Sequence, residues 1–243
     1  MTTESGRIET VDRTAVSLDV EAAIFSTPAV RRLKPDPVPE AVIWATIDAA
    51  TRGPSSGNDR RWGWVVVRDE AIKQIIGRWY LEAWQQLEPG RRERLRAVAT
   101  RLLGRGEPDA KPLSDDPNFR SGDHLAHNIA RAPVWIFAVL RGISGQPSLV
   151  DGADIFGAIQ NLMLTARKYG IGSTLTMLHR RREQDISRVL GLPPDARPIA
   201  LIPMGYPESG RFHTPRRPPV ETVTHWERWG DQHGRKSDVS VGM

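Results

Sequence analysis

The segment Ala153–Tyr169 constrains the fold of this chain most, because its apolar residues lie on more than one side of a helix. One row of apolar side chains recurs at the spacing of a helical turn, and a second flank is apolar as well. The residues of these two rows are Phe156, Ile159, Met163, Ile155, Leu162 and Ala166. A helix of this kind is buried inside a domain. We therefore expect the chain to fold around it, with Gly170 ending the helix.

Four segments rich in β-branched and aromatic residues predict strands. They are Trp62–Arg68, Pro133–Leu140, Ile171–Met177 and Pro198–Met204. Helical patterns fill much of the remaining chain. They cover Leu18–Ser26, with Ser17 as a candidate cap, Glu40–Thr51, Glu70–Gln86, Arg91–Leu103, Asp123–Ala130 and Arg182–Leu190. Four strands that alternate with about six or seven helices predict one layered domain of the α+β or α/β class.

Three polar segments lie outside these elements. Residues 1–17 are polar and aperiodic and predict an N-terminal arm. The stretch Gly104–Gly122 is rich in Pro, Asp and Gly, and we interpret it as a long loop and a mobile lid. From Pro207 onward the chain is polar and basic, yet it holds Trp226 and Trp229. Two tryptophans with little other core predict docking, either on the chain's own domain or on a partner chain.

Composition excludes several classes of protein. The chain has no cysteine, which excludes disulfides, thiol nucleophiles, cysteine-ligated zinc and iron–sulfur clusters. Its longest strongly apolar stretch, Val134–Leu140, is much shorter than the ~20 residues of a membrane span. Residues Met1–Asp19 carry early charges and lack the apolar run of a secretory leader. We therefore expect a cytoplasmic protein with no membrane partner.

The charge balance is basic, with 34 lysines and arginines against 29 aspartates and glutamates. The arginines are scattered among acidic residues and form no stripe with interleaved aromatic residues, as a nucleic-acid surface would. Arginine suits phosphate and carboxylate groups because its planar guanidinium binds them in bidentate fashion. The charge therefore predicts one or two local anion sites and no specific nucleic-acid partner.

Several common catalytic motifs are absent from the sequence. It contains no Gly-x-Gly-x-x-Gly after a strand, no Walker loop and no Gly-x-Ser-x-Gly elbow. These absences argue against a Rossmann dinucleotide site and against a serine hydrolase. His124 and His127 are three residues apart on a predicted helix, but the spacing of other residues indicates no third ligand for zinc. We therefore expect no metal site.

Three polar or basic regions are candidates for binding, and each also has an ordinary structural interpretation. Arg31-Arg32 and Arg216-Arg217 are able to grip one phosphate, but such doublets are common in an arginine-rich chain. The loop Gly53–Asn58 offers hydroxyls, an amide and close backbone approach to a planar ligand, but many loops share this composition. Ser173–His179 brings polar groups to the end of a predicted strand, but any strand that leaves the core ends in polar residues in the same way.

Together, and in this order, four segments resemble the FMN-dependent nitroreductase superfamily. They are Val30–Asp69, Asp123–Leu140, Asp154–His179 and Ile199–Gly230. The resemblance implies an α+β fold of the nitroreductase type, with a central mixed, mostly antiparallel sheet flanked by helices. It also implies an intertwined homodimer with FMN at the interface. Residues 18–206 then form the FMN-binding domain, and residues 207–243 form a C-terminal extension that packs on the dimer partner.

The resemblance implies four groups of cofactor-binding residues. Arg31 and Arg32 match the N-terminal arginines that hold the FMN phosphate and pyrimidine edge, and Arg216 and Arg217 match a basic C-terminal pair that closes on the phosphate. A small polar loop that reaches the flavin from the other subunit is matched by Pro54, Ser55, Ser56 and Asn58. A strand end beside the isoalloxazine near N5 is matched by Thr176, Met177 and Leu178. No catalytic side chain is required, because the flavin N5 does the chemistry.

The implied activity is that of an FMN-dependent NAD(P)H oxidoreductase. Such an enzyme reduces nitroaromatic, quinone or similar electron-poor small molecules by two-electron hydride transfer. Tyr80, Trp84 and the Gly104–Gly122 loop are candidates for shaping the acceptor pocket. Other roles within the fold stay open: deazaflavin-linked reduction, dehalogenation, flavin fragmentation and non-catalytic flavin or nucleotide binding.

The chain departs from the family pattern at two places. Thr27-Pro28-Ala29 stands where the family usually has an Arg and a Ser, which removes a guanidinium and a hydroxyl from the phosphate side. Arg60-Arg61 stands where Gln-Pro is common. These two arginines are either additional anion contacts or simply exposed residues.

Overall fold

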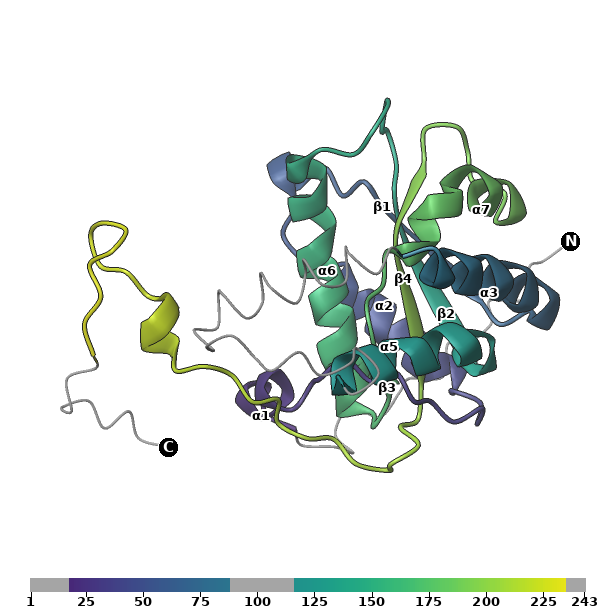
Figure 1. Ribbon diagram of the computed structural model, residues 1–243. Coiled ribbons are helices and arrows are strands. Elements are labelled where there is room, and N and C mark those ends of the chain that lie inside the picture. The colour runs from purple at the N-terminus through teal and green to yellow at the C-terminus, as the bar shows by residue number, and fades with distance from the viewer. Residues whose placement is uncertain (1–17, 88–115, 235–243) are drawn as a thin grey trace, which may run out of the picture.

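The computed structural model describes residues 18–87 and 116–234 and contains a four-stranded sheet between helices (Figure 1). The strands lie in the order β1-β2-β4-β3, and each neighbouring pair is antiparallel. Their bounds are Trp62–Val67 for β1, Val134–Leu140 for β2, Gly172–Ser173 for β3 and Arg197–Gly205 for β4. The sheet and its helices confirm the α+β class.

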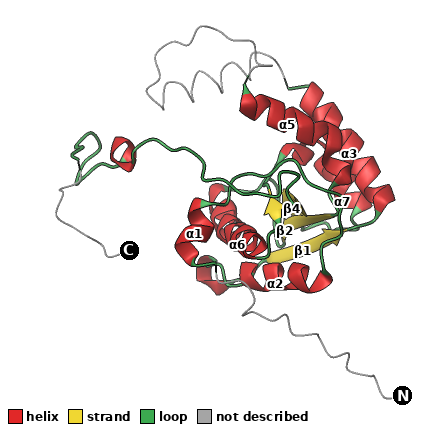
Figure 2. Ribbon diagram, turned by 90° about the horizontal axis from the view of Figure 1, so that it is seen from below, coloured by secondary structure: helices red, strands yellow, loops and turns green. Residues whose placement is uncertain are grey.

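Helices cover both faces of the sheet. Figure 2 shows α2 and α6 on one face, with α1 beside α6, and α3, α5 and α7 on the other face. The bounds are Val20–Phe25 for α1, Glu40–Ala50 for α2, Glu70–Gln85 for α3, Pro117–Asn128 for α5, Leu149–Lys168 for α6 and Glu183–Val189 for α7. Short 3-10 helices cover Ser56–Asn58, Ile129–Arg131, Leu178–Arg182 and Val220–Val223.

Strand β2 is buried along its whole length, because helices pack on both of its faces. Its side chains alternate between two clusters, as the period of a strand requires. Ile136 and Ala138 pack with residues of α2 and α6. Trp135 and Phe137 pack with residues of α3, α5 and α7. The two-sided burial explains why this strand is a continuous apolar run without polar alternation.

Helix α6 is the central buried helix that its sequence pattern predicts. Gly170 ends it as expected, with a positive φ of 71°. The helix starts at Leu149 instead of Ala153, because Ser148 and Asp151 form a capping box that satisfies the first backbone N–H groups. The fully buried apolar residues of α6 are Ile155, Ala158, Ile159, Leu162 and Ala166. No helix in the described ranges combines the length and apolarity that crossing a membrane would take.

The start of α5 differs from the expectation. The helix begins at Pro117 instead of Asp123, because the Asp116 side chain accepts the Asn118 N–H and a proline is favourable in the first turn. Residues 117–122, which composition assigns to a loop, are therefore helical. The rest of that loop, the predicted helix at 91–103 and the N-terminal arm lie outside the described residues.

Two further boundaries are corrected. The predicted strand Ile171–Met177 reduces to the short β3, and Thr176 then forms only an isolated bridge with Leu201. Helix α1 is capped by Asp19, whose side chain accepts the Ala22 N–H, instead of by Ser17. The strand length and the α1 cap are both mispredicted because each depends on a single polar or backbone contact. Such a contact adds nothing to the apolar repeat from which the elements are predicted.

His179 is a titratable residue inside the core. It is 2 % exposed, and its ring packs edge-on against Phe137 at a centroid separation of 5.5 Å. Its Nε2 donates to the carbonyl oxygen of Pro198 at 2.9 Å, and its Nδ1 has no hydrogen-bond partner among the described residues. Burial lowers the pKa of His179 to about 4, so the ring is neutral in the folded protein.

We expect His179 to make the protein less stable in mild acid. Its folded pKa of about 4 lies below the ordinary value of about 6.5, so the unfolded chain binds more protons between these values. The His179 contribution to the free energy of unfolding then falls by about 2 kcal/mol from pH 7.5 to pH 5. Urea titrations of the wild type and of His179→Gln at both pH values measure the difference. Equal pH dependence in the two proteins would contradict the assignment.

Candidate functional site

The segment Val30–Lys34 is extended and lies along the β3–β4 end of the sheet. Val30 N donates to Ser173 O at 2.9 Å, and Lys34 N donates to Tyr206 O at 2.8 Å. The prolines that follow it restrict the backbone to extended conformations. These backbone bonds fix the position of the Arg31-Arg32 pair against the sheet.

Glycines allow this close approach. A Cβ on Gly172 would lie 2.7 Å from the side chain of Val30. A Cβ on Gly205 would lie 2.8 Å from Pro133 and 3.2 Å from the carbonyl oxygen of Lys34. Real Cβ atoms do not make contacts below 3.0 Å, so both positions require glycine for the present packing.

Arg31 lies near a partly buried pair of hydroxyl groups. Tyr80 of α3 is 4 % exposed, and its hydroxyl is 2.8 Å from the hydroxyl of Thr176. Burial raises the pKa of the Tyr80 phenol, while the hydrogen bond to Thr176 and the nearby Arg31 charge lower it. The backbone of Thr176 exchanges two hydrogen bonds with Leu201, each 2.9 Å long. The structure therefore brings together Arg31 and Thr176, two of the residues singled out from the sequence.

Arg32 lies against α5. Its Nη1 donates to Nδ1 of His124 at 2.9 Å, because a guanidinium has no acceptor. Desolvation, and then the Arg32 charge, lower the pKa of His124. The two side chains line a hollow of about 460 Å³ together with other residues of α5. These are Phe119, Arg120, Asp123, His127 and Asn128.

Met177 and Leu178, which follow the isolated bridge of Thr176, lie at the edge of a larger hollow. Both residues line a space of about 1400 Å³ between the end of α3 and α7. Met177 is 38 % exposed, which leaves an apolar surface next to Thr176. Trp84, for which a role in shaping the acceptor pocket stays a prediction, links α3 to α5, since it stacks on Phe119 and donates to Asp123 at 2.9 Å.

The loop Gly53–Asn58 packs on the first half of α6. Ser56 N donates to Asp154 at 2.8 Å, and a Cβ on Gly53 would lie 2.9 Å from the backbone of Ala158. Ala158 precedes the last residue of α6 by ten positions, or about 15 Å along the axis. The C-terminal end of α6 leads into β3, and the Arg31 segment is bonded to Ser173 of β3. Within one chain, the Gly53–Asn58 loop therefore does not lie beside Arg31.

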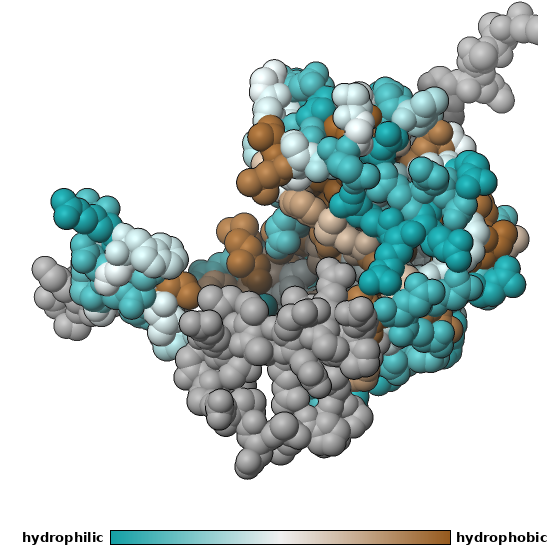
Figure 3. All heavy atoms as spheres, turned by 45° about the horizontal axis from the view of Figure 1, so that its top comes forward, coloured by the Kyte–Doolittle hydropathy of each residue, from teal (hydrophilic) through white to brown (hydrophobic). Residues whose placement is uncertain are grey.

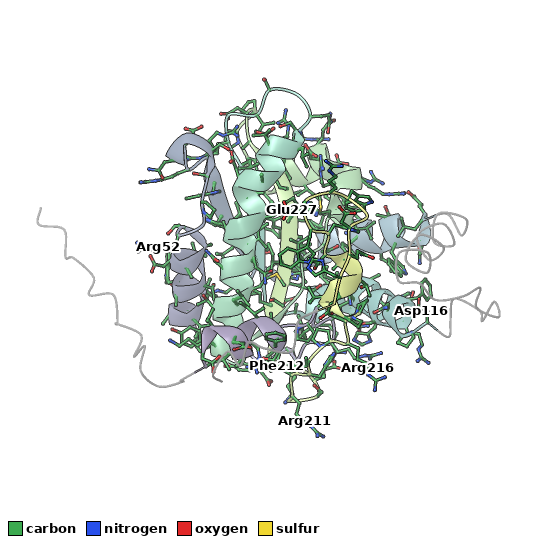
Figure 4. The ribbon with its side chains drawn as sticks, turned by 90° about the vertical axis from the view of Figure 1, so that its left-hand side faces the viewer. Arg52, Asp116, Arg211, Phe212, Arg216 and Glu227 are labelled. Atoms are coloured by element: carbon green, nitrogen blue, oxygen red, sulfur yellow. The ribbon has the colours of Figure 1, made fainter. Side chains whose placement is uncertain are left out.

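Arg216 and Arg217 are exposed on the segment that follows β4. This segment contacts the domain at Phe212, whose ring lies 3.9 Å from the guanidinium of Arg167 (Figure 4). Beyond that point it leaves the domain (Figure 1). Arg217 donates to the carbonyl of Arg216, a local contact. In the described chain, the predicted cofactor-binding residues therefore lie in three places: near the β3 end of the sheet, on the first half of α6 and on the segment after β4.

Sequence reasoning missed the contacts of Arg61. The interpretation of Arg61 as simply exposed is wrong, because its side chain is 23 % exposed and its guanidinium pairs with Asp151 at 2.8 Å, Asp154 at 3.0 Å and Asp59 at 3.2 Å. Asp151 belongs to the capping box of α6, a pattern that the sequence does carry. The pairing with Arg61 spans 90 and 93 positions of sequence and leaves no local pattern.

We expect Gly172→Ala to displace the Arg31 segment and to lower the free energy of unfolding by about 1–3 kcal/mol, because the new methyl group overlaps Val30. Gly63→Ala is the matched control, since its Cβ would make an ordinary contact of 3.7 Å with Val139. Urea unfolding measures both variants. Equal stability of the two variants would show that the close approach at Gly172 does not exist.

The chain matches known proteins over most of its length. The family model described as Nitroreductase family matches residues 26–206. An NADH dehydrogenase of Thermus thermophilus is 30 % identical over 223 residues, which cover 89 % of this chain and 100 % of that protein.

Solved structures show the same fold. The FMN- and NADPH-dependent nitroreductase NfnB from Sphigopyxis sp. strain HMH has a TM-score of 0.62 at 21 % identity, covering 87 % of this chain and 100 % of that chain. The FMN-dependent nitroreductase NfnB from Mycobacterium smegmatis, in complex with NADPH, has a TM-score of 0.62 at 20 % identity, covering 86 % and 97 %. These likenesses confirm the nitroreductase-type fold. By its family match and its Thermus relative, this chain belongs to the nitroreductase family.

Proposed function

We propose that this protein is an FMN-dependent NAD(P)H oxidoreductase that reduces nitroaromatic, quinone or similar electron-poor small molecules. The observation that carries the proposal is the placement of Arg31 near the bonded hydroxyls of Tyr80 and Thr176, with the apolar Met177 exposed beside them. The solved nitroreductases of the same fold include proteins described as FMN- and NADPH-dependent.

The donor set around Arg31 fits the ring edge of FMN. When bound, FMN supplies the two-electron chemistry at its N5. Arg31 would supply a positive charge to the N1–O2 edge of the bound flavin, which gains negative charge on reduction, and preorganised donors stabilise such charge. Thr176 presents a polar group and Met177 an apolar surface for a planar ring. None of these residues has to transfer a proton.

The phosphate side differs from the usual pattern. Thr27 donates its hydroxyl to Ala23 O at 2.5 Å, so it closes the end of α1. Pro28 is buried and has no hydrogen-bond donor. We therefore assign the phosphate to Arg216 and Arg217, with Arg32 at the edge of the α5 hollow as a further contact.

We also propose that the site is completed by a second copy of this chain. Arg31 lies near the β3 end of the sheet and the Ser55–Asn58 loop packs on the first half of α6, so in this proposal a second copy brings a loop to each Arg31. Large apolar side chains are exposed on α6 and on the C-terminal segment, and Figure 3 shows apolar surface in the hollow between that segment and the domain. They include Leu149, Val150, Phe156, Trp226 and Trp229. Residues 207–243 would then pack on the partner.

An absorbance spectrum tests the proposed function. The purified protein should be yellow, be bleached by NADPH or NADH, and recover its colour when a nitroaromatic or a quinone is added. A colourless protein that FMN does not stabilise against heat would overturn the proposal and favour non-catalytic binding. Bleaching only by a reduced deazaflavin would instead identify the deazaflavin-linked alternative.

Arg31→Ala should weaken FMN binding by about tenfold to a hundredfold, because a hydrogen bond to a charged group contributes about 1.5–3 kcal/mol. Arg68→Ala is the control, since Arg68 forms an exposed ion pair with Glu40, and such pairs contribute little. Flavin fluorescence titration gives the two dissociation constants. Wild-type affinity in Arg31→Ala would remove Arg31 from the site.

Phe156→Glu should disrupt the dimer, because it places a charge in the proposed interface of α6. Sedimentation should give twice 27.1 kDa for the wild type and a lower mass for the variant, with loss of bound flavin. Val66→Glu is the control, because Val66 on β1 is 37 % exposed and Phe156 is 38 % exposed. A wild type that sediments as one chain would refute the two-copy site.

A further inference from the structure

Arg61 is the cation at the centre of three carboxylates. Its Nη2 lies 2.8 Å from Asp151 and 3.0 Å from Asp154, and its Nε lies 3.2 Å from Asp59. The Arg61 side chain is 23 % exposed, and that of Asp154 is 4 % exposed. Removing the guanidinium would leave an unpaired buried carboxylate with two further acidic residues beside it, which is a costly arrangement.

Asp154 holds the Gly53–Asn58 loop at Ser56 and the start of β1 at Trp62. Its carboxylate accepts the backbone N–H of Ser56 at 2.8 Å, and its carbonyl oxygen accepts the indole N–H of Trp62 at 2.7 Å. Hydrogen bonding from Ser56 is the largest cause that lowers the pKa of Asp154, and Arg61 lowers it further. The carboxylate is therefore charged at neutral pH. It anchors Ser56 within the loop, while the backbone carbonyl of Asp154 anchors Trp62 after the loop.

The loop needs such an anchor because its backbone is unusual. Gly57 and Asn58 have φ values of 59° and 57°, in the left-handed region. Asn58 adopts this conformation at some cost, which surrounding contacts have to offset. Two bonds extend the support to Arg60, whose N–H donates to Ser55 Oγ at 3.2 Å and whose Nε donates to Asn58 at 2.9 Å.

We propose that the Arg61–Asp154 ion pair is a positioning clamp for the Pro54–Asn58 loop and thereby sets the affinity of the protein for its flavin. This inference rests on the proposed function, in which the loop reaches the flavin of the second copy. Neither residue touches the flavin in this proposal. They act through Ser56 and its neighbours. The chain places a partly buried charge network where the family commonly has Gln-Pro.

Hydrogen–deuterium exchange tests the clamp without any flavin. In Arg61→Ala the Ser56 amide should exchange at least about tenfold faster, because its acceptor is no longer fixed. Asp151→Asn is the matched control, because Asp151 also binds Arg61 but caps α6 through Ser148 instead of holding the Ser56 amide. Equal exchange of Ser56 in Arg61→Ala and in the wild type would overturn the clamp whether or not the protein binds FMN.

Measurements of FMN affinity test the proposed consequence of the Arg61–Asp154 clamp. Arg61→Ala and Asp154→Asn should each weaken FMN binding by about tenfold or more, and the double variant should bind about as well as either single one. Arg61→Lys, which keeps the charge, should recover part of the affinity, and Asp151→Asn should change it less than about threefold. Wild-type affinity in Arg61→Ala would overturn the inference and leave the proposed function intact. Absence of FMN binding by the wild type would refute the proposed function instead, with the exchange experiment still deciding the clamp.

The pH dependence separates positioning from general destabilisation. In the wild type, FMN affinity should hold well below the ordinary pKa of an aspartate, since the Asp154 pKa is lowered. In Arg61→Ala the acid loss of affinity should move to higher pH, because the carboxylate loses a cationic partner. An unchanged acid limb in Arg61→Ala would contradict the role of the ion pair, even if thermal stability falls.

Discussion

Burial of β2 between two helical layers is the constraint on which the rest of the structure depends. Because its alternate side chains enter separate apolar clusters, neither face of the sheet centre has room for polar chemistry. The polar groups therefore gather at the β3 end of the sheet, where β3 is only two residues long. There the Val30–Lys34 segment replaces a full strand, and Gly172 and Gly205 let it approach closely. The candidate site follows from where the apolar layers stop.

The strongest parts of the fold are predictable from the sequence, because they rest on burial. The continuous apolar run of β2 and the two apolar flanks of α6 identify both elements. Boundaries set by a single polar bond are less visible. Asp116 starts α5 through one side-chain bond, and Thr176 joins the sheet by an isolated bridge. Neither bond changes the apolar period, so pattern reasoning misplaces both ends.

The candidate site is predictable only as a list of segments. Arg31 and Thr176 stand out by composition and family pattern, and Tyr80 of α3 stands out only as a candidate for shaping the acceptor pocket, with no sign of its bond to Thr176. Its bond to Thr176 joins positions 96 apart, and the bond from Ser56 to Asp154 joins positions 98 apart. Contacts at such separations depend on the completed fold. The sequence therefore indicates the chemistry of the site and leaves its supporting contacts unseen.

Division of the proposed site within one chain would link assembly to cofactor binding. The Ser56 loop is held on the first half of α6, while Arg31 lies at the β3 end, about 15 Å or more along the helix axis. A ligand that needs both Arg31 and the Ser56 loop would bind two assembled copies of the chain and not a single copy. By mass action such a ligand stabilises the pair by an amount that grows with its concentration relative to its dissociation constant. In the proposed site, the missing Arg and Ser at Pro28 and Ala29 would reduce both flavin retention and the cohesion of the two assembled chains. The loop anchored by Asp154 would then carry more of the flavin affinity than it does in a relative with the usual Arg and Ser.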